Sequence, residues 1–144
     1  MDIFKINWFL AAVAGMLSFA CMALTLKKLT YLLSSPIILL YVFAVTTLLY
    51  LVLSVKRGLE FGLSLQAVGL IGLSSLFAFI GNLADTEALR LAPNPGYASA
   101  VKAGQIIVIT FAALLLFPDQ KLSLQGVFGV FLVFSGVIII ALQR

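Results

Sequence analysis

The chain has 144 residues, of which 63% are apolar and only 10% charged, with no histidine and a formal net charge of +4. A soluble globular domain is nearer half apolar and a quarter charged, so a soluble fold of this composition would expose large apolar patches. The composition therefore excludes an ordinary soluble domain and favours a protein whose solvent is the lipid bilayer. The basic residues stand singly or in pairs between apolar blocks, without the basic face that nucleic-acid binding requires.

Five mainly uncharged stretches approach the length of about 20 residues that a helix needs to cross a bilayer. The sequence predicts an all-α membrane protein, a single transmembrane domain over 1–144, with five helices at 6–26, 35–55, 64–91, 96–117 and 122–143. The fourth helix reaches this length only if Lys102 is accepted inside it. The first helix is expected to be retained, because Lys27 and Lys28 follow it where a signal peptide has small residues.

Proline and glycine mark the boundaries of these helices. Pro36 stands at the start of the second helix, where the missing backbone N–H costs nothing. Gly58 follows the end of that helix, as is typical of helix C-termini. The segment 93–96, with sequence PNPG, predicts a sharp turn between the third and fourth helices.

Lysine and arginine are divided evenly between the two sides of the predicted membrane. If the side alternates after every helix, each side has four, and Lys102 inside a helix accounts for the ninth. The two sets are Lys5, Lys56, Arg57 and Lys121, and Lys27, Lys28, Arg90 and Arg144. An excess of these residues in cytoplasmic loops normally sets orientation, so the even split predicts insertion both ways and an inverted homodimer. The alternative is that one N-terminal lysine or the kinetics of insertion fixes a single orientation.

The C-terminal half carries a pattern of small and apolar residues. Residues 88–93 read ALRLAP, an apolar helix ends at 115–117 as LLF, and residues 126–129 after a short polar turn read GVFG. This pattern resembles the second half of an EamA-type repeat, the repeat of the drug/metabolite transporter superfamily. The last helix, GVFLVFSGV over 129–137, is also similar to the final-helix dimerisation pattern of small multidrug resistance proteins.

The resemblance implies a half-size transporter made of one five-helix repeat. Larger members of the family carry two such repeats in opposite orientation, with the binding site at their interface. A lone repeat would obtain its second half from another copy, as the charge balance also predicts. The stretch 6–26 lacks the carboxylate that small multidrug resistance proteins carry in their first helix, so their proton-coupled mechanism cannot be transferred by position. EamA-type repeats also often have a glutamate after the fourth helix, where this chain has Pro118 and Asp119.

Polar and ionisable residues in the third and fourth predicted helices are the candidates for a substrate or proton pathway, because such residues are costly inside a membrane. They are Asn82, Asp85, Glu87, Ser99, Lys102 and Gln105. Asp85 and Glu87 lie about 200° apart on a helix of 3.6 residues per turn. One of them is therefore expected to face a cavity, while the other pairs with Arg90 or a lipid headgroup.

Lys102 lies about 9 Å past Gly96 at 1.5 Å per residue, too deep for a comfortable loop residue, though its long side chain can reach towards the membrane surface. With Ser99 and Gln105, one turn away on either side, it would form a polar stripe facing Asn82 and Asp85. The alternative is that Lys102 forms an ion pair with Asp85 or Glu87 that only locks the two helices together.

The last predicted helix has glycines seven residues apart, which leave a smooth face for close approach of another helix. This spacing predicts a dimer seam, and its residues are Gly129, Leu132, Val133 and Gly136.

These features predict a multi-pass protein of the cell (inner) membrane, a secondary transporter for a small organic solute with alternating access between two inverted subunits. Its expected partners are the bilayer, a second copy of itself and the solute. Two alternatives are translocation of a lipid or lipid-linked sugar, and a membrane subunit that transports nothing. An enzyme is not expected because no nucleophile–base constellation is present, and no metal site, cofactor or nucleic-acid partner is expected.

Overall fold

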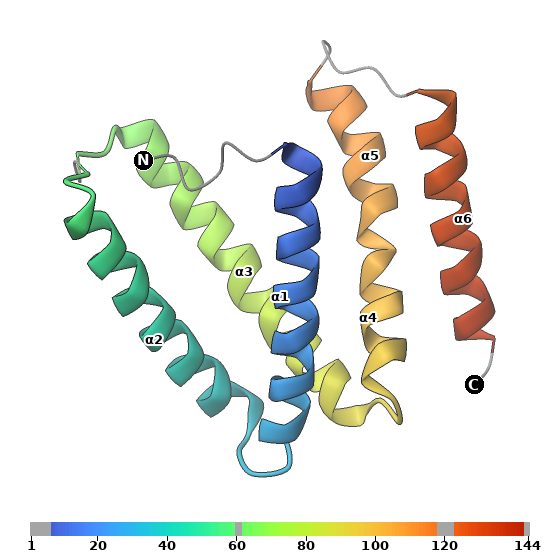
Figure 1. The fold of residues 1–144 in the computed structure, drawn as a ribbon, viewed down its shortest axis with the longest axis horizontal. Helices are drawn as coiled ribbons and strands as arrows, with labels where there is room; N and C mark the ends of the chain where they lie inside the picture. The colour runs from blue at the N-terminus through green and yellow to red at the C-terminus, as the bar shows by residue number, and fades with distance from the viewer. Residues whose placement is uncertain (1–6, 60–61, 118–122, 143–144) are drawn as a thin grey trace. The chain divides into compact units, whose positions relative to one another are not determined.

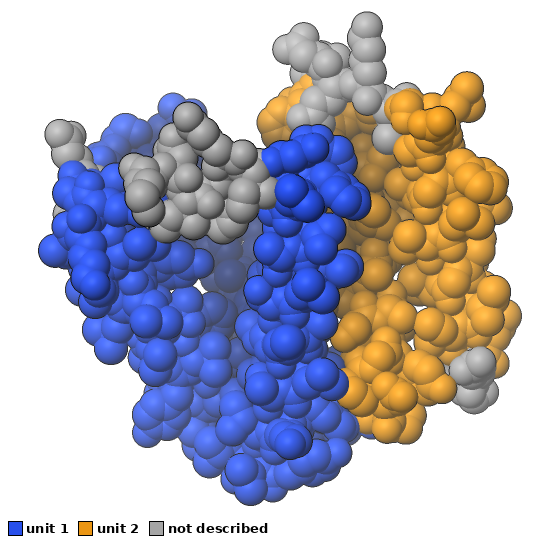
Figure 2. Space-filling model, viewed as in Figure 1, with its two compact units in different colours: residues 1–91 blue, residues 92–144 orange. Residues whose placement is uncertain are grey.

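A computed structural model describes residues 7–59, 62–117 and 123–142, and every regular element in these ranges is a helix (Figure 1). The chain divides into two compact units, residues 1–91 and 92–144, which Figure 2 shows in different colours. The sequence predicted a single transmembrane domain over 1–144, and the helices of that range pack in two groups, one in each unit.

Unit 1 consists of three long helices, α1 (Trp8–Leu29), α2 (Ser35–Lys56) and α3 (Leu65–Leu91). The ends of α2 and α3 lie within one residue of the predicted ends. Helix α1 begins two residues later than predicted and continues three residues further, so that Lys27 and Lys28 form part of its last turn. Cationic side chains in this position interact favourably with the negative end of the helix dipole.

The boundaries in unit 1 follow from local chemistry. The Asn7 side chain caps α1 by accepting a hydrogen bond from the backbone N–H of Phe9 at 3.2 Å. Gly58 ends α2 with a φ of +62°, in the left-handed region that favours glycine. The N–H of Gly58 bonds to the carbonyl of Val55, and the N–H of Leu59 bonds to that of Ser54. These two bonds form a Schellman motif, which satisfies carbonyls that the helix end would otherwise leave without donors.

Unit 2 consists of α4 (Pro95–Ala103), α5 (Gln105–Leu116) and α6 (Leu124–Ala141). The fourth predicted helix is therefore present but interrupted at one residue, Gly104. The Asn94 side chain accepts a bond from the N–H of Gly96 at the start of α4, and Ser123 does the same for Gly126 at the start of α6. These are the N-cap interactions expected of asparagine and serine.

Four helical segments are long and apolar enough to cross a bilayer: α1, α2, α3 and the combined stretch Pro95–Leu116 of α4 and α5. Helix α6 is apolar too but shorter. Its 18 residues give about 27 Å at 1.5 Å per residue, just below the roughly 30 Å of the hydrocarbon core. The all-α class with apolar spans is confirmed, and four of the five predicted helices reach spanning length within the described residues.

The buried residues of the described chain gather at one end of unit 1, where α1 ends, α2 begins and α3 ends. The buried apolar side chains are Leu26, Ile38, Leu39 and Leu89, and the buried polar residues are Ser35 and Thr86. We call this region, the six residues together with Lys27, the packed end. Helix α3 contacts both α1 and α2, and in Figure 1 α1 and α2 diverge as they leave the turn that joins them.

Candidate functional site

The three candidate residues on α3 lie in its last three turns and have different surroundings. The Asn82 amide donates to the carbonyl of Ala78 on the same helix, at 2.7 Å. Asp85 is half-buried and has an interaction partner of its own. Glu87 accepts a hydrogen bond from the Nε of Arg90 at 2.6 Å. Of the alternatives left open for the two carboxylates, the structure shows an ion pair between Glu87 and Arg90.

The Glu87–Arg90 pair joins residues three apart on one helix, and its side chains are 38% and 46% exposed. Pairs of this kind contribute little to stability because solvent screens them. On the other side of Glu87, the Ser35 hydroxyl lies close to the carboxylate, but no hydrogen bond of ordinary geometry joins the two. Glu87 therefore lies beside the packed end, because it follows the buried Thr86 directly on α3.

The other three candidates lie in unit 2, at the interruption between α4 and α5. Ser99 and Lys102 are exposed residues of α4, and Gln105 is the first residue of α5. The N–H of Gly104 bonds to the carbonyl of Val101 at 3.0 Å, a bond between residues three apart. A tightened turn of this kind aligns residues at a spacing of three. It therefore keeps Lys102 and Gln105 on the same side of the rod, despite the break.

The predicted polar stripe would combine α3 residues of unit 1 with α4 and α5 residues of unit 2. The structure brings Asn82, Asp85 and Glu87 together on one helix and Lys102 and Gln105 together around Gly104. That the two groups face each other across a cavity stays a prediction. The alternative ion pair of Lys102 with Asp85 or Glu87 stays a prediction too.

Lys27 has a structural contact that the sequence did not predict. Its Nζ donates to the carbonyl of Leu89 at 2.7 Å and to that of Arg90 at 3.2 Å, and it lies 5.4 Å from the centre of the Tyr31 ring. Lys27 therefore caps the C-terminus of α3 from the neighbouring helix α1, and neutralises the negative end of that helix dipole. These bonds join residues more than sixty positions apart in the sequence, so no local pattern could have indicated them.

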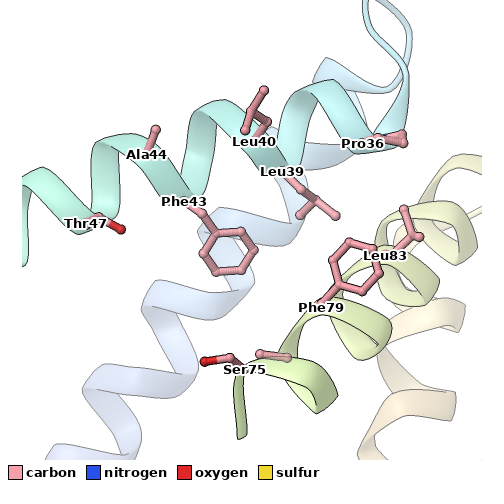
Figure 3. A pocket seen from close by; sticks show the side chains of 10 residues that line it. Pro36, Leu39, Leu40, Phe43, Ala44, Thr47, Ser75, Phe79 and Leu83 are labelled. Atoms are coloured by element: carbon pink, nitrogen blue, oxygen red, sulfur yellow. The ribbon is translucent and has the colours of Figure 1, made fainter. Parts of the chain in front are cut away.

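A groove of about 570 Å³ lies between α2 and α3 in unit 1 (Figure 3). Its lining is almost entirely apolar and consists of Pro36, Leu39, Leu40, Phe43, Ala44, Thr47, Ser75, Ala78, Phe79 and Leu83. The side chains of Phe43 and Phe79 extend from the two helices into the space between them. No signal in the sequence separates these residues from those that face lipid, because both sets are apolar.

The predicted seam on α6 has free space at its two glycines. A Cβ added at Gly129 or at Gly136 would meet no atom within 4 Å, and Leu132 is exposed while Val133 is half-buried. Val137, one turn past Val133, packs inside unit 2, where its methyl groups lie 3.9 Å from a Cβ built at Gly104. The role of the four seam residues as a dimer seam stays a prediction.

The described residues contain no group of three or more His, Cys, Asp and Glu side chains that could hold a metal ion. The six candidate residues offer two carboxylates, one ammonium group, two amides and one hydroxyl. These groups can bind a polar solute or carry a proton.

An all-α chain with four helices of spanning length fits a multi-pass membrane protein in a lipid bilayer. No protein-family model, no curated protein and no solved structure matches the chain.

Proposed function

We propose that the chain is a secondary transporter for a small organic solute, and that two copies in inverted orientation form the working unit. The observation that carries the proposal is the pair of polar residues inside the fourth apolar span, Lys102 and Gln105, on either side of a tightened turn at Gly104. Polar side chains on helices inside the membrane typically line the binding sites of transporters. An ionisable residue at this depth favours a pathway for solute or protons.

Depth along the helix supports a role for Lys102 in the membrane interior. It lies seven residues past Pro95, or about 10 Å along a helix. A long lysine side chain can reach towards the membrane surface over part of that distance. Lys102 is exposed in the structure, so its ammonium group can meet water or headgroups as well as an ionic partner.

The same proposal assigns the chain to the EamA-type repeats, on the pattern of residues 88–93 and of the last helix. The structure supplies a consistent architecture: three long helices, one interrupted span and a final apolar helix, five in all if α4 and α5 count as one. With an odd number of spans, a second copy in the opposite orientation would complete an inverted pair.

The groove between α2 and α3 favours a second candidate function, the translocation of a lipid or lipid-linked sugar. Its apolar lining could hold a hydrocarbon chain while a polar headgroup moved elsewhere on the protein. This candidate uses the same inverted pair and differs from the first in its substrate.

Thiol accessibility tests whether Lys102 lies in a water-filled pathway. Lys102→Cys would be made together with Cys21→Ser, which removes the only native cysteine, and treated in vesicles with a membrane-impermeant trimethylammonium methanethiosulfonate. Rapid modification is expected. The matched control is Val108→Cys, which replaces an exposed apolar residue deeper in the same span, and it should react at least tenfold more slowly. Equally slow reaction at both positions contradicts the pathway.

Flux measurements then test transport itself. Proteoliposomes would be assayed with radiolabelled amino acids, sugars, nucleosides and quaternary amines, with and without a pH gradient. Lys102→Met combined with Asp85→Asn should retain the fold and lose at least nine-tenths of any flux. A double variant with full flux would remove both residues from the site, and no flux with any probe above that of empty liposomes would overturn the proposed function.

A further inference from the structure

We propose that the groove between α2 and α3 is a binding site for a single acyl chain of a membrane phospholipid. The proposal rests on the chain's membrane location and is independent of whether it transports a solute. Four properties of the groove carry it: depth, lining, volume and the closure of one end.

The depth of the groove equals about one leaflet of a bilayer. Its lining on α2 runs from Pro36 to Thr47, which is eleven residues or about 16 Å along a helix. The lining on α3 runs from Ser75 to Leu83, or about 12 Å. The hydrocarbon core is roughly 30 Å thick, so one leaflet contributes about 15 Å. Because Pro36 stands in the first turn of α2, the groove begins near the membrane surface and ends near the bilayer centre.

The lining selects against a polar occupant. Eight of the ten lining residues are apolar, the other two are Thr47 and Ser75, and none is charged. A charged or strongly hydrated solute would lose its water here without gaining partners, which is unfavourable. A hydrocarbon chain loses no hydrogen bonds on entering and gains dispersion contacts with the rings of Phe43 and Phe79.

The size of the groove suits one hydrocarbon chain. The groove measures about 570 Å³, within the range of roughly 300–1,000 Å³ that is usual for small-molecule sites. A spanning helix of a second copy would extend over the whole hydrocarbon core of roughly 30 Å, about twice the length of the groove.

The groove is closed at the packed end. Leu39 belongs both to the groove lining and to the buried core, and its neighbour Ile38 is 1% exposed. From there α2 and α3 diverge, so that Thr47 and Ser75 lie far apart at the other end (Figure 3). The groove is therefore a wedge that narrows towards the membrane surface at Pro36 and Leu83. The small side chains of Ala44 and Ala78 leave room in the middle of this wedge.

Photochemical labelling tests the proposal directly. The full chain would be reconstituted in vesicles of phosphatidylcholine and phosphatidylglycerol at 3:1, with a trace of phosphatidylcholine that carries a diazirine in the middle of one acyl chain. After irradiation, peptide mass spectrometry locates the label. The label is expected to concentrate on 39–47 and 75–83, and Ala78→Trp, which fills the groove, should reduce it there at least fivefold.

The matched control is Ala20→Trp, which adds the same side chain to an exposed position of α1 outside the groove. It should leave the labelling of the groove unchanged. If Ala78→Trp lowers the helix content measured by circular dichroism, Ala44→Trp tests the same space from α2. Uniform labelling of all faces of α1, α2 and α3, or groove labelling that survives both tryptophans, overturns the proposal.

A second copy in the groove is the competing occupant. Leu40→Cys, made together with Cys21→Ser, would place one thiol on the groove lining. Efficient disulfide formation between two chains through this thiol, together with absent lipid labelling, would assign the groove to a protein contact. If the groove holds a second copy or nothing at all, the proposed solute transport still stands, because Lys102 and Gln105 do not line the groove.

Discussion

The packed end of unit 1 and the helices of unit 2 hold together in different ways. The packed end has buried side chains from three helices and a lysine that bonds to the backbone of a neighbouring helix. In unit 2, none of the side chains that the structure describes is buried, and α6 approaches the α4–α5 rod closely at Gly104 and Val137. In lipid, helices associate through packing and polar contacts rather than through the hydrophobic effect. Unit 1 therefore has a buried anchor of its own, whereas the described side chains of unit 2 provide none.

The largest expected effect comes from breaking the packed end. Leu89 is 1% exposed, and truncating a buried leucine typically costs about 2–5 kcal/mol through lost contacts and the cavity left behind. Leu89→Ala should therefore lower the free energy of unfolding by about this amount in detergent–lipid bicelles. Leu91→Ala, two residues away at 70% exposure, is the control and should cost less than about 0.5 kcal/mol. Equal losses would mean that the packed end is not an anchor.

The polar contact of the packed end is tested by a pair of adjacent lysines. Lys27→Met removes the donor to the carbonyls of Leu89 and Arg90. Hydrogen bonds to charged groups contribute about 1.5–3 kcal/mol, and the stability lost should fall in this range. Lys28→Met makes the same change at an exposed position and removes the same charge. If the two variants unfold at the same temperature, the bonds of Lys27 contribute nothing.

A third prediction addresses the open face of unit 2. Gly129→Leu adds a side chain that meets no atom of its own chain within 4 Å, so any weakening of the dimer reports contact with a partner. The dimer should dissociate about tenfold more readily in mild detergent, a change of about 1.4 kcal/mol. Gly15→Leu on α1, where an added Cβ is equally unobstructed, should leave the dimer intact. Unchanged dimer in the Gly129 variant would move the seam elsewhere.

The smallest effect is expected at the Glu87–Arg90 pair. Because both side chains are more than a third exposed, Glu87→Gln should leave the unfolding temperature nearly unchanged, and any small loss should shrink at high salt. Thermal unfolding at two salt concentrations measures this change, with Arg90→Gln as the reciprocal variant. A loss of several kcal/mol would mean that Glu87 supports the packed end through Ser35 as well.

The positions of the helices could be predicted from the sequence because bilayer thickness and local capping determine them. Gly58 and the segment 93–96 are signals that act within a few residues, and both separate helices as expected. The interruption at Gly104 was not predicted, since a glycine inside an apolar run is compatible with an unbroken helix. The turn is tightened by a bond from the N–H of Gly104 to the carbonyl of Val101, and no residue pattern around it signals this.

The candidate site could be predicted only as a set of residues. Asp85 and Lys102 stand out in the sequence because an ionisable side chain is costly inside a membrane whatever its orientation. The same argument does not identify the residues with which they interact. The role of Lys27 was missed because its bonds to the end of α3 depend on how α1 and α3 pack. The α2–α3 groove was missed because a leucine that lines a groove and a leucine that faces lipid are the same in sequence.

The membrane orientation of the chain tests the central claim, an inverted pair of half-size transporters, most directly. A reporter fused to the C-terminus, read from both sides of the membrane in intact cells, should give two populations of similar size, because the basic residues divide four against four. Two further lysines inserted beside Lys56 should drive the chain into one orientation and abolish flux, and co-expression with an oppositely biased variant should restore it. A wild-type reporter confined to one side would contradict the account.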